Sequence, residues 1–204
     1  MNVRRVLCVL LSMMLFAIGA SAQAVKASFG VTGGGAATMM STEPATTSPM
    51  HFSGYGGAFA TIKYGRVIGL KAGANYLMQG ASYDISKVNI KTSQTYLNVP
   101  VTFMVNLKSV MSFEFGFYQN ILMDSSLTES GSREVLITPD EGALKYNVGA
   151  LAGLNFNMGR FVFLSMKYHY GLSNSYVIYG EGYPSSFATV GLGFNIINTR
   201  KKAF

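Results

Sequence analysis

The sequence predicts an all-β fold, an eight-stranded antiparallel up-and-down β-barrel that spans a membrane. After residue 22, apolar and polar residues alternate in eight stretches, each long enough to cross a bilayer as a tilted strand. The connections between the stretches alternate between long and short, as in barrels that have tight turns on one side of the membrane. The polar face carries mostly Gly, Asn, Ser and Thr, whereas soluble sheets display more Lys and Glu to water.

Each of the eight stretches is predicted to form one strand. The apolar residues recur at every second position, which is the period of a strand with one face in an apolar environment. We expect the strands at 26–37, 53–64, 67–83, 94–107, 110–124, 146–158, 161–174 and 186–197.

The connections predict the location of the protein. The three short ones, 64–66, 107–109 and 159–160, contain Gly or polar residues that allow a tight turn. The four long ones are polar segments at 38–52, 84–93, 125–145 and 173–185. Outer-membrane barrels have short periplasmic turns and long extracellular loops. The pattern therefore predicts a bacterial outer-membrane protein.

The alternation also predicts which face meets the lipid. In the stretch 146–158, Leu154 belongs to an apolar face and Asn155 to a polar one. A Lys on the lipid face near the midplane costs roughly 2 to 4 kcal/mol, so Lys71, Glu114 and Lys167 should point into the barrel. The alternative is a secreted sandwich or lipocalin-like barrel, in which the apolar face would point inward.

The N-terminus has the pattern of a cleaved signal peptide. Arg4 and Arg5 precede an apolar run over residues 6–18, and a small-residue site at 20–22 follows. Cys8 is the only cysteine and lies in this segment, so no disulfide is expected after cleavage. We predict a signal peptide at 1–22, a barrel at 23–198 and a short basic tail at 199–204.

Several short motifs resemble a small outer-membrane β-barrel family that includes the PorT-like proteins. They are YLNVP at 96–100, YHYGLSN at 168–174 and VGLGF at 190–194. Asn98 departs from the pattern, because the family often has a carboxylate there. Phe194 or Phe204 could serve as the C-terminal aromatic that barrel assembly machinery reads. The resemblance implies fold and location, and it carries over no catalytic or ligand residues.

The charges of the predicted lumen form one candidate site. Closing eight strands leaves an interior just wide enough for side chains, so charges inside it must pair. We expect a lumen charge network of Lys71, Glu114, Lys167 and His169. The network is either a gate on an ion path or a plug that fills the barrel.

The longest connection, 125–145, is the other candidate site, because loops on a rigid scaffold often bind partners. Its charged residues give the predicted interaction surface: Glu129, Arg133, Glu134, Asp140 and Glu141.

Other chemistries find little support. Ser165 and His169 share a strand face, but four residues span about 13 Å along a strand, too far for a direct hydrogen bond. His51 and His169 are isolated and the carboxylates are scattered, so no metal site is expected. Without Arg4 and Arg5 the chain has 14 Lys and Arg against nine Asp and Glu, a net charge of +5 that is spread singly. Nucleic-acid binding needs grouped cations. We expect no catalytic residue, cofactor, metal or nucleic acid.

These features favour a non-enzymatic outer-membrane barrel with a side-chain-filled lumen, acting as a structural or interaction protein through its extracellular loops. One alternative is an accessory component of protein secretion or envelope assembly, which the PorT-like resemblance implies. A second alternative is a narrow ion or small-solute channel. The expected partners are outer-membrane lipid, the barrel assembly machinery during insertion, and envelope or secretion proteins.

Overall fold

The computed structural model describes most of the chain from residue 25 to residue 198. The described residues are 25–40, 50–85, 88–107, 110–129, 135–136, 145–159, 161–174, 176–178, 181–183 and 185–198. The predicted signal peptide and the predicted basic tail lie outside these residues. Within the described part there is no helix that is long and apolar enough to cross a bilayer.

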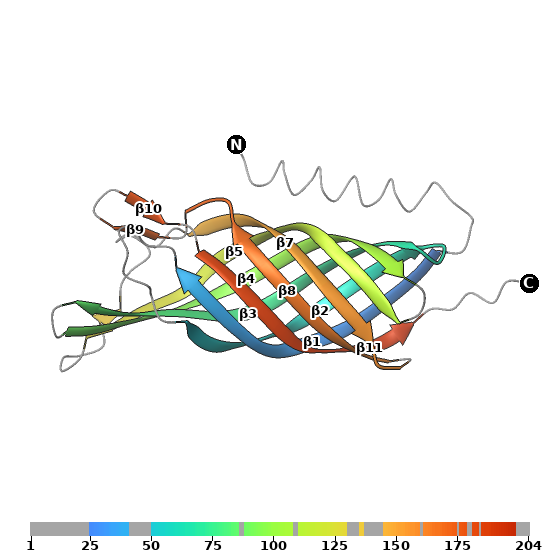
Figure 1. The fold of residues 1–204 in the computed structure, drawn as a ribbon, viewed down its shortest axis with the longest axis horizontal. Helices are drawn as coiled ribbons and strands as arrows, with labels where there is room; N and C mark the ends of the chain where they lie inside the picture. Colours follow the sequence, from blue (N-terminus) through green and yellow to red (C-terminus); the bar gives the residue numbers. More distant parts are fainter. Residues whose placement is uncertain are drawn as a thin grey trace, which may run out of the picture.

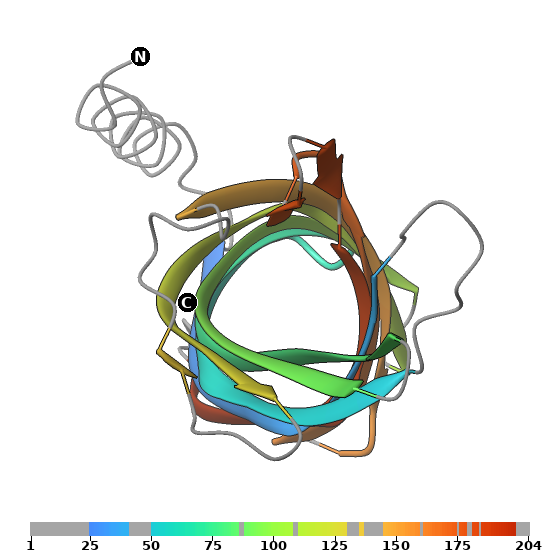
Figure 2. The same cartoon turned by 90° about the vertical axis from the view of Figure 1, so that its left-hand side faces the viewer.

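Eight long strands close into one antiparallel barrel, as predicted (Figure 1). They are β1 (Val25–Met40), β2 (His51–Tyr64), β3 (Ile68–Ile85), β4 (Val88–Leu107), β5 (Met111–Glu129), β7 (Tyr146–Asn157), β8 (Val162–Gly171) and β11 (Ser185–Asn198). Each strand pairs with the next, and β1 pairs with β11 from Ser28↔Asn198 to Met40↔Ser185. Figure 2, which looks along the barrel, shows the resulting ring. The ring leaves no open sheet edge in the membrane, where unpaired backbone groups would be costly.

One predicted loop is wrong. Segment 84–93 continues the hairpin, because β3 and β4 stay paired up to Ile85↔Val88 and β5 follows to Ile90↔Glu129. In Figure 1 this three-stranded extension reaches beyond the other strands at the left end of the barrel. Its polar side chains indicated a loop. Outside the lipid, however, strands with polar side chains can stay paired, because the pairing is made by backbone hydrogen bonds. Val88, Ile90 and Thr92 favour strand geometry.

Two other predicted loops contain short strands. In the segment 125–145, β6 (Val135–Leu136) pairs with the end of β5. In the segment 173–185, β9 (Tyr176–Ile178) and β10 (Glu181–Tyr183) form a small hairpin. These elements lie at the same end as the extended β3–β4–β5 sheet (Figure 1).

The opposite end of the barrel has the tight connections. Between β2 and β3 the chain reverses within residues 65–67, where Gly65 adopts φ of 64°. This left-handed conformation is accessible to Gly at little cost. The unequal ends match the long and short connections that the sequence predicted.

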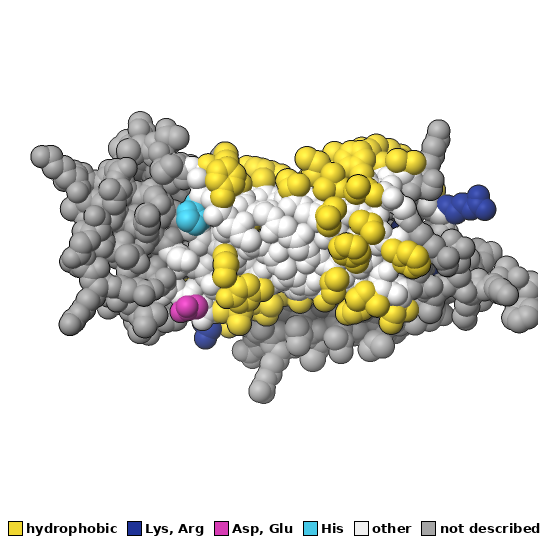
Figure 3. All heavy atoms as spheres, turned by 90° about the horizontal axis from the view of Figure 1, so that it is seen from below, with side chains coloured by type: hydrophobic (Ala, Val, Ile, Leu, Met, Phe, Trp, Pro, Cys, Tyr) yellow, Lys and Arg dark blue, Asp and Glu magenta, His cyan; other side chains and the backbone are white. Residues whose placement is uncertain are grey.

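The barrel is apolar outside and polar inside. On the outer face Phe117 is 67% exposed and Ile196 is 60% exposed, whereas Glu114 and Asn120 on the inner face are at most 1% exposed. Figure 3 shows hydrophobic side chains over the outer wall, with the described charged side chains near the two ends. This arrangement is the inverse of a soluble barrel and fits a wall in lipid.

We expect Phe115→Lys to lower the free energy of unfolding in lipid vesicles by about 2 to 4 kcal/mol, because Phe115 lies on the lipid face in the middle of the wall. Met158→Lys, just past the end of β7, should cost less than about 1 kcal/mol. Gel mobility across a urea titration measures both. Equal effects at the two positions would contradict the assigned membrane span.

Candidate functional site in the barrel lumen

The centre of the lumen is an ionic cluster of three side chains from three strands. Lys71 on β3 places Nζ 2.9 Å from Oε1 of Glu114 on β5, and Lys167 on β8 places Nζ 2.9 Å from Oε2. The Glu114 side chain is fully buried. A carboxylate held this far from water requires nearby cations, and both of its oxygens have one.

Neighbouring strands are shaped to let this cluster form. Across the β5–β7–β8 register, Glu114 pairs with Gly153 and Gly153 pairs with Lys167. A Cβ atom at residue 153 would lie 2.7 Å from Cγ of Lys167, so only Gly leaves room for the lysine stem to cross toward Glu114. Asn155 on β7 donates from Nδ2 to Oε1 of Glu114 at 2.7 Å and to the Ser112 hydroxyl at 3.3 Å.

Aromatic rings enclose the cluster on one side. The Lys71 ammonium lies 4.5 Å from the ring centroid of Phe59 and 4.8 Å from that of Phe163. The two rings meet edge to face, with centroids 5.5 Å apart. Both are within the range of cation–π attraction, which adds to the ion pair. The ring of Phe163 occupies the space over Gly193, where a Cβ would lie 2.1 Å from its Cζ atom.

A second layer of rings lies nearer the long loops. His169 stacks on Phe187 with centroids 4.1 Å apart, and Tyr118 meets both rings edge to face. Leu77 and Leu151 pack in the same cluster as Tyr118 and Phe187. His169 was predicted as a member of the charge network, but the described ion pairs join only the other three residues. Its contacts are those of a lumen filler.

A ladder of asparagines crosses three strands beside these layers. Asn75 donates to Oδ1 of Asn98 at 3.2 Å, and Asn98 donates to Oδ1 of Asn120 at 2.7 Å. Asn98 is the residue that departs from the pattern of the PorT-like resemblance. An amide can accept from one neighbour and donate to the next, so it extends the ladder without adding a charge.

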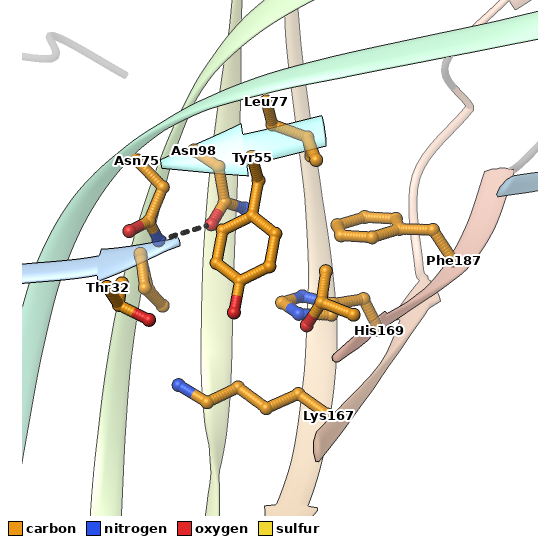
Figure 4. Close-up of a pocket in the computed structure, with 10 residues that line it drawn as sticks. Thr32, Tyr55, Asn75, Leu77, Asn98, Lys167, His169 and Phe187 are labelled. Atoms are coloured by element: carbon orange, nitrogen blue, oxygen red, sulfur yellow. Dashed lines mark hydrogen bonds between the residues drawn. The ribbon is translucent and has the colours of Figure 1, made fainter. Parts of the chain in front are cut away.

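The described residues enclose three small cavities in the lumen. One, lined by Tyr55, Lys167 and His169 among others, has a volume of about 20 Å³ (Figure 4). Two others, on either side of Lys71, have volumes of about 10 and 30 Å³. A water molecule needs roughly 10 to 15 Å³ on this measure, so each cavity holds about one or two waters. In Figure 4 the Lys167 side chain crosses the view below Tyr55, His169 and Phe187.

Ser165 and His169, which share a strand face, are not hydrogen-bonded to each other. Ser165 Oγ and His169 Nδ1 are both buried, and neither has a hydrogen-bond partner in the part of the chain that is described. Within the same residues, no group of three His, Cys, Asp or Glu side chains is arranged to hold a metal ion.

The predicted interaction surface lies almost entirely outside the described residues. Glu129 is the last residue of β5. The other four are outside the description: Arg133, Glu134, Asp140 and Glu141.

The alternation of polar and apolar residues does not by itself predict the lumen aromatics. Phe59, Tyr118, Phe163 and Phe187 are buried on the inner face, although they are aromatic residues on the face predicted to be polar. The available signal was position parity within a strand: Tyr118 has the parity of Glu114 on β5, and Phe163 has that of Lys167 on β8.

Comparison with known proteins identifies the family. Residues 21–177 match the family described as outer membrane protein beta-barrel domain. The chain belongs to this family. It is therefore a bacterial outer-membrane β-barrel protein, and the predicted family is confirmed, while the PorT-like subgroup stays a prediction. No functionally curated protein matches the sequence significantly.

Two solved structures show the same fold. Neisserial surface protein A is 14% identical with a TM-score of 0.58, and the match covers 83% of this chain and 99% of that one. The attachment invasion locus protein Ail of Yersinia pestis, solved with the heparin analogue sucrose octasulfate, is 11% identical with a TM-score of 0.53. That match covers 84% of this chain and 99% of Ail. At these identities the likeness concerns the fold alone.

Glu114→Gln should destabilise the barrel by about 3 to 5 kcal/mol, because it leaves two buried ammonium groups without a carboxylate. The triple variant Lys71→Met, Glu114→Leu and Lys167→Met removes every charge of the cluster. Its free energy of unfolding should lie within about 1 kcal/mol of the wild-type value, or above it. Urea titration followed by gel mobility measures both. A Glu114→Gln protein as stable as wild type would show that the cluster is not a buried ionic contact.

Gly193→Ala should cost about 1 to 3 kcal/mol, because the new methyl group would overlap the Phe163 ring. Phe163→Leu in the same chain should restore much of that loss. Gly35→Ala is the matched control, since a Cβ there would meet nothing closer than 3.9 Å. The same titration applies. Equal costs for Gly193→Ala and Gly35→Ala would contradict the described packing of the lumen.

Proposed function

We propose that this protein is a non-enzymatic outer-membrane barrel that acts as a structural or interaction protein through its extracellular loops. The observation that carries the proposal is the filled lumen. An ionic cluster, two layers of rings and an asparagine ladder occupy the interior, and the cavities between them have room for about one or two waters each. Among the described residues these contacts leave only small cavities, which supports a lumen closed to hydrated solutes.

The outer end of the barrel supports a role in recognition. The β3–β4–β5 sheet projects past the rim, and the long connections leave from the same end (Figure 1). Loops and sheet extensions on a rigid barrel can present a surface at a fixed orientation. The scaffold itself is held by the closed backbone ladder and by the lumen contacts.

The composition of the longest connection indicates the chemistry of a partner. Segment 125–145 has four acidic residues and two basic ones, Arg133 and Lys145. Such a segment favours a basic protein surface over a polyanion. Ail has been solved with a sulfated sugar, but the acidic character of this segment argues against the same ligand class here.

Planar-bilayer recordings test the sealed lumen. We expect no stepwise conductance from the wild-type protein. A variant with Phe59→Ala, Phe163→Ala and Lys71→Ala removes three side chains that fill the centre and should conduct, which also proves insertion. Ion conductance by the wild-type protein at a comparable level would overturn the proposal in favour of a narrow channel.

Complementation of a deletion strain tests the role of the loops. Replacing residues 130–144 by a short Gly-Ser turn should abolish rescue of the envelope phenotype, because it removes the proposed surface. The triple lumen variant without charges should rescue fully if it is inserted at wild-type level. Full rescue by the loop-trimmed barrel would refute the interaction role. Loss of protein secretion on deletion would instead support the accessory role in secretion.

A further inference from the structure

The buried ionic cluster has more positive than negative charge. Two ammonium groups, those of Lys71 and Lys167, share the single carboxylate of Glu114. Asp124 carries the other carboxylate among the described side chains, and it is exposed. The cluster therefore holds one unbalanced positive charge. An uncompensated charge in a narrow, largely dry interior is costly, so a counter-charge is expected close by.

A third lysine faces the same space from the side of the short turns. Lys63 on β2 is half-buried and, with Lys71, lines the cavity of about 30 Å³. No ion pair to Lys63 is found among the described residues. Two lysines that line one small cavity repel each other through their positive charges, and an anion between them would remove that repulsion.

The other groups that line this cavity are suited to an anion. They include the hydroxyls of Ser28, Thr61 and Ser112 and the side-chain amide of Asn195, and no acidic residue contributes to the lining. The Ser112 hydroxyl accepts a hydrogen bond from Asn155, which leaves its own proton to donate. The volume of about 30 Å³ suits about two waters or one monatomic ion.

The distribution of charge along the barrel favours entry of an anion from the short-turn end. Lys26 and Arg66 are exposed there, and Lys108 and Arg160 stand in the other two short connections of the sequence. Figure 3 shows the described charged side chains at this end as Lys or Arg, whereas the other end carries both an acidic and a basic side chain. All acidic residues except Glu114 stand in the long connections or in the strand ends next to them: Glu43, Asp84, Asp124, Glu129, Glu134, Asp140, Glu141 and Glu181.

We propose that the cavity between Lys63 and Lys71 is a binding site for a monatomic anion, with chloride as the occupant in the cell. The anion accepts hydrogen bonds from the surrounding ammonium, hydroxyl and amide groups. It supplies the negative charge that the cluster of Lys71, Glu114 and Lys167 lacks. The site lowers the excess positive charge of the lumen from the periplasmic side and does not require conduction through the barrel.

Halide-dependent stability tests the site in the full mature protein in detergent. The midpoint of the heat-modifiable gel shift is measured in sodium chloride and in sodium gluconate at equal ionic strength. Gluconate is too large for the cavity. Chloride at ten times its dissociation constant should raise the midpoint by about 3 to 6 °C. Equal midpoints in the two salts would overturn the proposal.

Two variants separate the cavity from a general effect of surface charge. Lys63→Met removes one lining ammonium and should abolish the difference between chloride and gluconate. Arg66→Met removes a charge from the same rim without touching the cavity, and it should retain the difference. Loss of the difference in both variants, or in neither, would contradict the proposed site.

Bromide provides a readout that does not depend on a folded variant. Crystals of the wild-type protein soaked in sodium bromide should show an anomalous peak in the cavity, in contact with the ammonium groups of Lys63 and Lys71. A peak confined to the outer surface of the protein, or no peak, would refute the assignment.

Discussion

Closing eight strands into a ring leaves an interior that is only wide enough for side chains, and the structure of this protein follows from that constraint. The wall must hide its backbone from lipid, so each strand pairs on both sides and β1 meets β11. The residues that point inward then have no bulk water around them. Any charge among them must find a partner across the lumen, and Glu114 finds two lysines from strands on either side.

The remaining space in the lumen is filled by aromatic side chains that lie over glycines of neighbouring strands. The Phe163 ring lies over Gly193, and the Tyr118 ring lies over Gly149, where a Cβ would fall 2.4 Å from the ring. Gly153 performs the same role for the stem of Lys167. In the sequence these glycines only mark the inner face as lined by small residues. In the structure each one leaves room for a large side chain from a neighbouring strand. This complementarity fills a round lumen with side chains from strands that cannot move closer together.

The sequence was sufficient for the barrel and for the centre of its lumen. The two-residue period assigned Leu154 to the lipid and Asn155 to the interior, and the cost of charge in lipid placed Lys71, Glu114 and Lys167 inside. Strand pairing then brought these three residues together. Pairing depends on register across strands far apart in sequence, so a single strand pattern could not show that His169 stacks on Phe187 and does not meet Glu114.

Two features could not be read from polarity. Phe163 and Phe187 interrupt a polar face, so the alternation of polar and apolar residues does not predict that they fill the lumen. That prediction needs the cross-strand register, which shows which glycines leave room for large side chains. Polarity did not predict the extended hairpin of β3 and β4. Polar residues indicate a loop only where the strand has to end at the membrane surface. Here the backbone ladder continues into water up to Ile85↔Val88.

The central claim is that a buried carboxylate joins two lysines and thereby seals the lumen. Solid-state NMR in lipid bilayers tests it directly, through dipolar couplings between the 15Nζ atoms of lysine and the 13Cδ atom of Glu114. Contacts of 2.9 Å from Lys71 and from Lys167 predict two strong couplings, one of which disappears in Lys167→Met. A carboxylate that couples to water protons and to neither lysine would contradict the account.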